Sequence, residues 1–303
     1  SSGLGTRSAN LSGDVSIQNG STNFTVRLGG HFWRSWGGGN TDRINNIKGI
    51  GYQLKQENDV KNWGGGPRLT FSTDFQLDKS SALSVSTTFS TRMRNSDNVI
   101  ETFTGLEGQN LDYLWKQATD NFTYTLGMDA NIDYRKNFKK AGRELGVSMQ
   151  YSGSQDNTDY SFLRYGVAGN ETRNETSLNI GKNNETTIQV DYTEPLHPKL
   201  TWEVGTKITL RSVKSDYHFD SFDYLSQVFS SIEYRNNQFD YYQNVFGGYS
   251  QFTYNANSRY SFKVGGRYEA TEFGGVLYQP TVEKYTGKPY QNFIPYLNVN
   301  RKL

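Results

Sequence analysis

Apolar and polar residues alternate along most of the chain between Asp14 and Tyr268, in paired runs joined by short turns and separated by long polar segments. In the runs 69–77 and 83–89, apolar residues fall mostly on one parity and Ser, Thr, Asp or Gln on the other. Side chains of a β-strand point alternately to opposite faces, so each run has one apolar and one polar face. Short turns at one end and long loops at the other are typical of a transmembrane β-barrel.

The alternation predicts an all-β, antiparallel, up-and-down barrel wall of about eleven strands in one domain, residues 1–303. The predicted elements are five strand pairs and a last strand, at 10–33, 69–92, 122–151, 188–210, 241–268 and 293–299. The predicted long loops are 35–66, 95–120, 152–182, 213–238 and 272–290, with room in them for strand extensions above the membrane, for example at 229–234.

Local sequence signals refine these elements. Asn19-Gly20 favours a tight hairpin turn because both residues tolerate positive φ. The two prolines of Glu194–Pro198 predict a turn, because proline cannot donate a hydrogen bond to a sheet. A change of apolar parity near Gly247-Gly248 predicts a β-bulge. The repeated Trp-Gly-Gly-Gly at 36–39 and 63–66 is interpreted as a pair of flexible strand exits.

A soluble β-sandwich that binds carbohydrate also has strands with one apolar face, so the pattern leaves that alternative open. Runs of about ten residues match the length that crosses a bilayer, and the regular short–long alternation of loops is not that of a Greek-key sandwich. The polar face also carries charges in mid-strand, which favours a water-filled lumen. These residues are Arg27, Asp74, Asp129, Asp133, Glu203, Lys207, Lys263, Arg267 and Glu269. Burial of Phe71, Val85, Leu126 and Val204 in a packed core would contradict the barrel.

Composition narrows the function classes. No run approaches the roughly 18 apolar residues of a membrane helix. Aromatic residues make up 15% of the chain, and such residues suit the two membrane–water boundaries. Charges nearly balance, with 32 basic and 30 acidic residues, so no nucleic-acid partner is expected. The chain has no cysteine, which excludes disulfides and thiolate chemistry. Its first residues, 1–5, do not read as a signal peptide.

Candidate chemistry is sparse. The three histidines have no partners at metal-ligand spacing, and no nucleophile elbow, phosphate loop or dinucleotide motif occurs. The sequence therefore predicts no enzyme, no metal and no cofactor. Aromatic rings facing water can stack on sugars or other rings, so aromatic residues of the long loops are the candidate ligand-binding residues. They are Trp36, Trp63, Tyr113, Trp115, Tyr160, Tyr165, Tyr224 and Tyr278.

Three segments resemble the outer-membrane β-barrel domain of the TonB-dependent receptor-like family of the Bacteroidetes type. The first is Gln189–Leu196, reading QVDYTEPL, with the return strand Leu200–Gly205, reading LTWEVG. The second is Tyr249–Glu269, which ends in Gly-Gly-Arg-Tyr-Glu, and the third is Phe293–Leu297, reading FIPYL. They occur in the order that the family shows.

The resemblance implies a barrel of about 22 strands, preceded by a plug domain, so the chain is expected to be an internal part whose sheet stays half open. It implies a receptor in the bacterial outer membrane that contacts lipid and imports a small-molecule or oligomeric nutrient. The inner-membrane TonB complex would drive import through the plug. A passive pore, or an assembly or secretion scaffold, remains the alternative.

Overall fold

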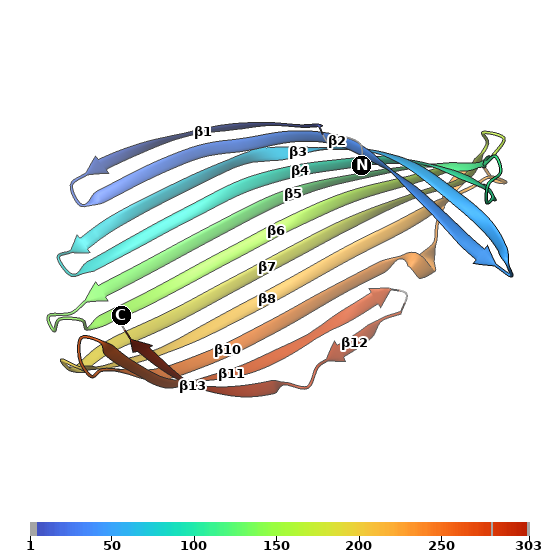
Figure 1. Cartoon of the computed structure of the whole chain (residues 1–303). Coiled ribbons are helices and arrows are strands. Elements are labelled where there is room, and N and C mark those ends of the chain that lie inside the picture. The colour runs from blue at the N-terminus through green and yellow to red at the C-terminus, as the bar shows by residue number, and fades with distance from the viewer. Residues whose placement is uncertain (1–4, 280, 302–303) are drawn as a thin grey trace.

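The chain forms one continuous antiparallel sheet. The computed structural model describes residues 5–279 and 281–301, in a sheet of 13 strands (Figure 1). The elements are β1 (Gly5–Asn19), β2 (Thr22–Ile47), β3 (Ile50–Asp78), β4 (Ser81–Leu106), β5 (Asp112–Asn137), β6 (Glu144–Tyr165), β7 (Glu171–His197), β8 (Leu200–Asp223), β9 (Val228–Ser231), η1 (Glu233–Arg235), β10 (Asn237–Asn255), β11 (Tyr260–Gln279), β12 (Glu283–Thr286) and β13 (Tyr290–Arg301).

Eleven of these strands are long and each pairs with the next long strand, as in an up-and-down barrel wall. The remaining two, β9 and β12, have four residues each and pair with β8 and β11. The predicted fold class and the eleven predicted strands are thereby confirmed.

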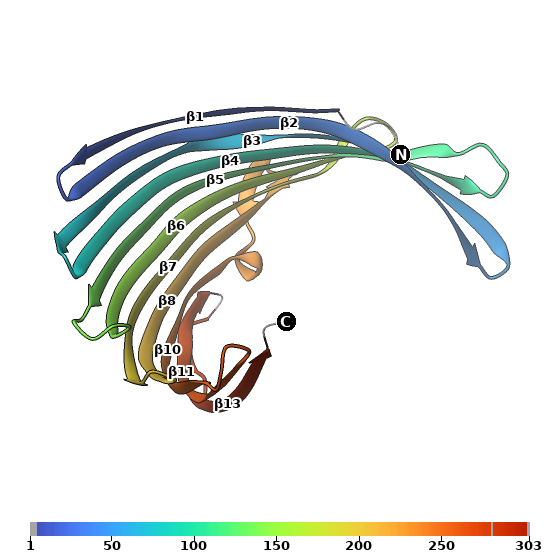
Figure 2. The ribbon, with the colours of Figure 1, turned by 60° about the vertical axis from the view of Figure 1, so that its left-hand side comes forward.

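The sheet is a curved wall with two edges. In the described residues β1 pairs with β2 alone and β13 with β11 alone, so the sheet does not close on itself. Figure 2 shows the wall bent into a trough, with β1 and β13 on opposite rims. The half-open sheet expected from the sequence is confirmed.

Strand register places apolar residues in rows on one face and polar residues in rows on the other. One row runs across β4 to β8 through Val85, Ile132, Met149, Ile188 and Ile208. The adjacent row, one residue along each strand, is polar: Ser86, Asn131, Gln150, Thr187 and Thr209. Residues directly opposite on paired strands share a face, so these rows lie on opposite sides of the wall.

The apolar face has no protein layer over it. Phe71 is 37% exposed and Leu126 51% exposed, while Val85 and Val204 are half-buried. In the described part of the chain, Phe162 and Phe219 are the buried hydrophobic residues. A sandwich would cover the apolar face with a second sheet, so the soluble sandwich is excluded. The apolar belt predicted to contact lipid is confirmed.

The strands are much longer than a membrane requires. The nine strands β2 to β8, β10 and β11 have 19–29 residues, whereas a bilayer is crossed by about 9–11 tilted residues. Short turns at 20–21, 79–80, 138–143, 198–199 and 256–259 define the turn end of the wall. The opposite, extended end is closed by connections at 48–49, 107–111, 166–170 and 224–227.

The assignment of these segments mainly to loop is therefore wrong: they are mostly strand, and the strand extensions expected above the membrane are much longer than the example at 229–234, where β9 covers 228–231. Residues 152–159 read SGSQDNTD, with no apolar residue on either face, yet they pair fully with β5 and β7. A strand above the membrane contacts water on both faces. Backbone hydrogen bonds hold it in the sheet, and its side chains need not alternate between apolar and polar. Alternation detects the membrane-crossing half of each strand and misses the extended half.

Two local predictions are also corrected. The Glu194–Pro198 turn is wrong, because β7 continues to His197 and the turn is Pro198-Lys199, with a register irregularity between Pro195 and His197. Pro195 is tolerated because β6 pairs with β7 only as far as Thr193, so the missing N–H faces no strand. The tight turn after Asn19 is confirmed, with Gly20 at φ 58°.

The predicted bulge at Gly247-Gly248 is wrong. Pairing is regular there, and the register shift of β10 lies between Gln238 and Phe239. The apparent change of parity arises because Tyr249 is an aromatic residue of the polar face, where its hydroxyl donates a hydrogen bond to Asp191 Oδ1 at 2.7 Å.

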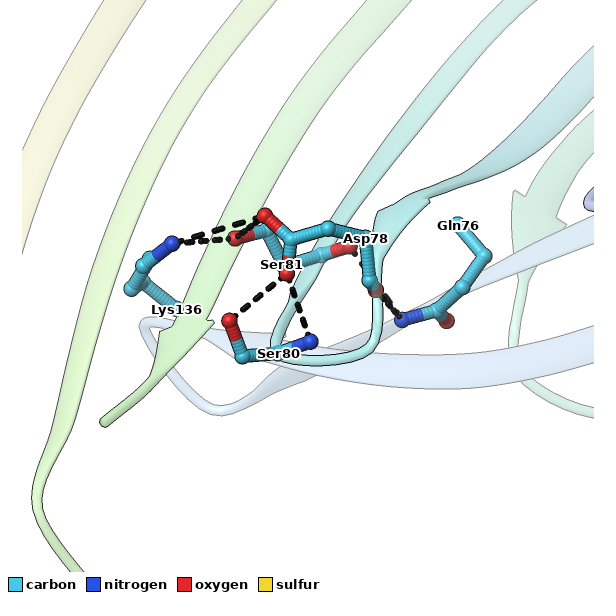
Figure 3. Close-up of polar contacts among 5 residues, drawn as sticks. All are labelled: Gln76, Asp78, Ser80, Ser81 and Lys136. Atoms are coloured by element: carbon cyan, nitrogen blue, oxygen red, sulfur yellow. Dashed lines mark hydrogen bonds and ion pairs between the residues drawn. The ribbon is translucent and has the colours of Figure 1, made fainter. Parts of the chain in front are cut away.

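The β3–β4 turn is held by Asp78 (Figure 3). The Ser80 hydroxyl and backbone N–H each donate to Asp78 Oδ1 at 2.6 Å, and the Ser81 hydroxyl donates to Oδ2 at 3.0 Å. The Lys136 ammonium lies 3.5 Å from Oδ2, which links the turn to β5. The Ser80 hydrogen bonds, with that of Ser81 and the charge of Lys136, hold the pKa of Asp78 well below its ordinary value.

Asp78→Asn is expected to lower thermal stability at neutral pH and to have less effect in acid. A carboxyl group whose pKa is depressed on folding stabilises the folded state above its unfolded pKa of about 3.9. That contribution disappears as the pH falls through the lower folded-state pKa. Unfolding in detergent micelles, followed by circular dichroism at neutral pH and at increasingly acidic pH, measures the difference. Lys79→Gln, in the same turn but outside the network, is the control, and a pH-independent difference between Asp78→Asn and wild type would contradict the assignment.

Candidate functional site

The aromatic residues predicted to bind ligand lie mostly in strands and not in loops, which corrects their assignment. Tyr224 alone among them lies in a connection, after β8. Trp36 is in β2, Trp63 in β3, Tyr113 and Trp115 in β5, Tyr160 and Tyr165 in β6, and Tyr278 in β11.

These residues do not form one site. Trp63 and Phe122 both pair with Asn95 in the strand register, so their side chains lie on the same, apolar face. Their ring centroids are 6.0 Å apart. Tyr113 contacts Phe103 at 5.8 Å and Tyr224 contacts Phe222 at 5.1 Å. These contacts are pairwise packing within the wall and do not bring the predicted residues together.

Trp115 and Tyr160 belong instead to a group of side chains on the concave, polar face. Strand parity places Tyr160, Phe162 and Arg164 of β6 on this face, since Met149 of the same strand is on the apolar one. The Arg164 guanidinium lies 4.9 Å from the Trp115 ring centroid and 5.5 Å from that of Phe162. Planar guanidinium groups stack favourably on aromatic faces.

Two further arginines meet the same group. Arg173 of β7 lies directly opposite Arg164 in the register, and its guanidinium is 5.0 Å from the Phe162 ring centroid. Arg235 of η1 lies 3.4 Å from the ring centroid of Phe219, a β8 residue on the same face. We call Arg164, Arg173 and Arg235, with the carboxylate Glu175, the arginine cluster.

Glu175 is the acid of the arginine cluster. Its side chain is 11% exposed, and its Oε1 accepts a hydrogen bond from Arg173 Nε at 2.7 Å. Arg235 Nη1 lies 3.7 Å from the same oxygen. One carboxylate therefore serves two arginines, and within the cluster three cations face one anion.

The segment after β8 folds back over the concave face and supports the cluster from one side (Figure 2). Asn236 accepts a hydrogen bond from the Phe219 backbone N–H at 2.8 Å and donates one to Ser231 Oγ at 2.9 Å. The Ile232 backbone N–H donates to the Phe219 carbonyl at 3.0 Å. These bonds fix Arg235 beside Phe219.

Sequence reasoning missed the arginine cluster because its members are separated by turns and lie outside the alternating runs. One signal is visible in retrospect. Arg164 and Arg173 flank the short connection 166–170, so a hairpin there sets two like charges opposite each other. The arrangement can hold a negatively charged group by hydrogen bonds from guanidinium forks.

A second feature of the concave face is a polar groove of about 450 Å³ nearer mid-wall. Its lining includes His31, Arg68, Arg92, Asp129 and Asp156. Charges of both signs lie along it, as expected for a surface that contacts water.

Among residues 5–279 and 281–301, no three His, Cys, Asp or Glu side chains lie together in a way that could hold a metal ion. Within the same residues, no helix has the length and hydropathy needed to cross a membrane.

Two solved structures are weakly similar to this chain. One is the outer-membrane protease OmpT from Escherichia coli, with 14% identity, a TM-score of 0.28, and coverage of 92% of this chain and 96% of that chain. The other is the translocator domain of the autotransporter NalP from Neisseria meningitidis, with 8% identity, a TM-score of 0.20, and coverage of 99% and 88%. Likenesses this low carry no argument about function. The comparison with curated proteins finds no match.

The expectation that the chain is no enzyme is corrected, because one of the two structures is that of an enzyme; the likeness to it assigns no activity to this chain. OmpT is an outer-membrane protease.

A family model supplies the classification. The model described as the outer membrane protein beta-barrel family matches residues 136–303, more than half of the chain. The match supports the outer-membrane barrel and does not single out the TonB-dependent receptors expected from the resemblance. Together with the uncovered apolar belt, it places the chain in the bacterial outer membrane, in contact with lipid. The chain belongs to the outer membrane protein beta-barrel family.

Proposed function

We propose that this chain is part of the barrel wall of an outer-membrane receptor that imports a nutrient by active transport. The observation that carries the proposal is a broad, polar concave face on a wall of eleven long strands that has not yet closed. Barrel diameter grows with strand number, and barrels wider than small eight-stranded ones enclose a channel or a plugged lumen.

The unpaired edges support the same proposal. An open sheet edge facing lipid leaves backbone groups without hydrogen bonds, which the hydrocarbon region does not tolerate. We infer that β1 and β13 pair with further strands of the same barrel, so that residues 1–303 form part of a larger barrel domain. In the proposed receptor, a plug fills the wide lumen of this barrel. The inner-membrane TonB complex acts on that plug to drive import.

Growth of the source bacterium with and without the gene tests this function. We expect the deletion strain to leave at least one small-molecule or oligomeric nutrient in a defined medium that the wild type removes, as measured by mass spectrometry of the spent medium. An uncoupler that collapses the inner-membrane proton gradient should abolish that removal in the wild type.

Two outcomes would overturn the proposal. Uptake that continues unchanged with the uncoupler identifies a passive pore. Identical spent media from the two strains, combined with loss of other outer-membrane proteins in the deletion strain, identify an assembly or secretion scaffold.

A further inference from the structure

We propose that the arginine cluster binds an oxyanion, a carboxylate or phosphate group of a small ligand that reaches the concave face from the extended end of the wall. The inference concerns binding alone, so it holds whether or not the wall takes part in energised import. Three observations support it: the opposed arginine charges, a guanidinium nitrogen without a hydrogen-bond partner, and aromatic rings packed against the arginines.

The charge arrangement is unfavourable without a counter-ion. Arg164 and Arg173 lie directly opposite each other on paired strands, and like charges in that position destabilise a sheet. Glu175 does not compensate Arg164, because its carboxylate accepts a hydrogen bond from Arg173 and lies near Arg235. A bound anion between the opposed arginines would convert the repulsion into attraction.

Arg164 has unused hydrogen-bonding capacity. Its Nε is buried and has no hydrogen-bond partner in the described part of the chain. Its Nη2 reaches Gln117 Oε1 at 3.5 Å, at the outer limit of a hydrogen bond. A buried donor without an acceptor is destabilising, whereas an oxyanion accepts from a guanidinium through two parallel hydrogen bonds.

The guanidinium groups are held in place before any ligand arrives. Trp115 and Phe162 support Arg164, Phe162 also supports Arg173, and Phe219 supports Arg235. Phe162 and Phe219 are the buried hydrophobic residues of the described chain, at 7% and 2% exposure. The two buried hydrophobic side chains of the described residues therefore lie against arginines of the cluster, and such preorganisation favours binding.

Calorimetric titration of the chain in detergent micelles tests the inference, with inorganic phosphate and succinate as separate probes in low-salt buffer. We expect saturable binding of at least one probe, and the probe that binds identifies the phosphate or the carboxylate as the recognised group. Arg164→Gln should weaken that binding at least tenfold. Arg164→Lys, which keeps the charge and loses the fork, should give an intermediate affinity.

Arg94→Gln is the matched control. Arg94 is an exposed residue of β4 on the same polar face as the arginine cluster. Its replacement lowers the net charge by as much as Arg164→Gln does and leaves the cluster intact. Circular dichroism of each variant checks the β-sheet content before titration. Absence of saturable binding for both probes, or equal weakening by Arg94→Gln and Arg164→Gln, would overturn the site. Energy-independent uptake would overturn the transport proposal and leave this titration unaffected.

Discussion

Met149→Arg is expected to destabilise the membrane-inserted wall by about 2–4 kcal/mol, the effect of arginine at the bilayer midplane on the lipid face of a barrel. Met149 is 44% exposed and lies between Ile132 and Ile188 in the central apolar row. The guanidinium would have to enter hydrocarbon without a partner. Guanidinium titration of the chain in phospholipid vesicles, followed by tryptophan fluorescence, measures the change in free energy of unfolding.

Gln150→Arg is the matched control, because Gln150 is the next residue along β6 and is exposed on the polar face. Arginine there would face water, so we expect a change within about 0.5 kcal/mol, as for ordinary surface substitutions. Equal losses for the two variants would show that the apolar rows do not contact lipid.

Gly66→Ala is expected to have the second large effect, a loss of about 1–3 kcal/mol or more, typical of overpacking. Gly64 to Gly66 are buried inside β3, where β2 and β4 approach closely. A methyl group on Gly66 would collide with the Thr91 carbonyl of β4, a backbone atom that cannot rotate away. Gly65 adjoins it at φ 147°, a conformation that favours glycine.

Gly146→Ala serves as the control for Gly66→Ala. Gly146 of β6 has no atom within 4 Å of an added methyl group, so we expect unchanged or slightly higher stability from the reduced entropy of the unfolded chain. The same titration in vesicles compares the two. If Gly66→Ala were as stable as Gly146→Ala, the close approach of β4 to β3 would be wrong.

This close approach also corrects the interpretation of the two Trp-Gly-Gly-Gly repeats as flexible strand exits. Both lie within continuous strands, 36–39 in β2 and 63–66 in β3. Glycine suggests flexibility when its neighbours are unknown. At 64–66 the neighbouring backbones exclude any side chain, and that exclusion becomes visible once strand register is known.

The sequence determined the membrane-crossing half of the wall. A face that must contact lipid imposes a strict parity, so Val85, Ile132 and Ile188 could be placed on it without a structure, and the strand count followed from the same parity. The open edge was expected from the family resemblance and not from the parity. Tertiary structure alone decided how far the strands extend beyond the membrane-crossing half, and it alone showed the arginine cluster. Both depend on pairing between distant segments. Where both faces of a strand contact water, apolar and polar residues need not alternate, so the sequence does not show that the segment is a strand.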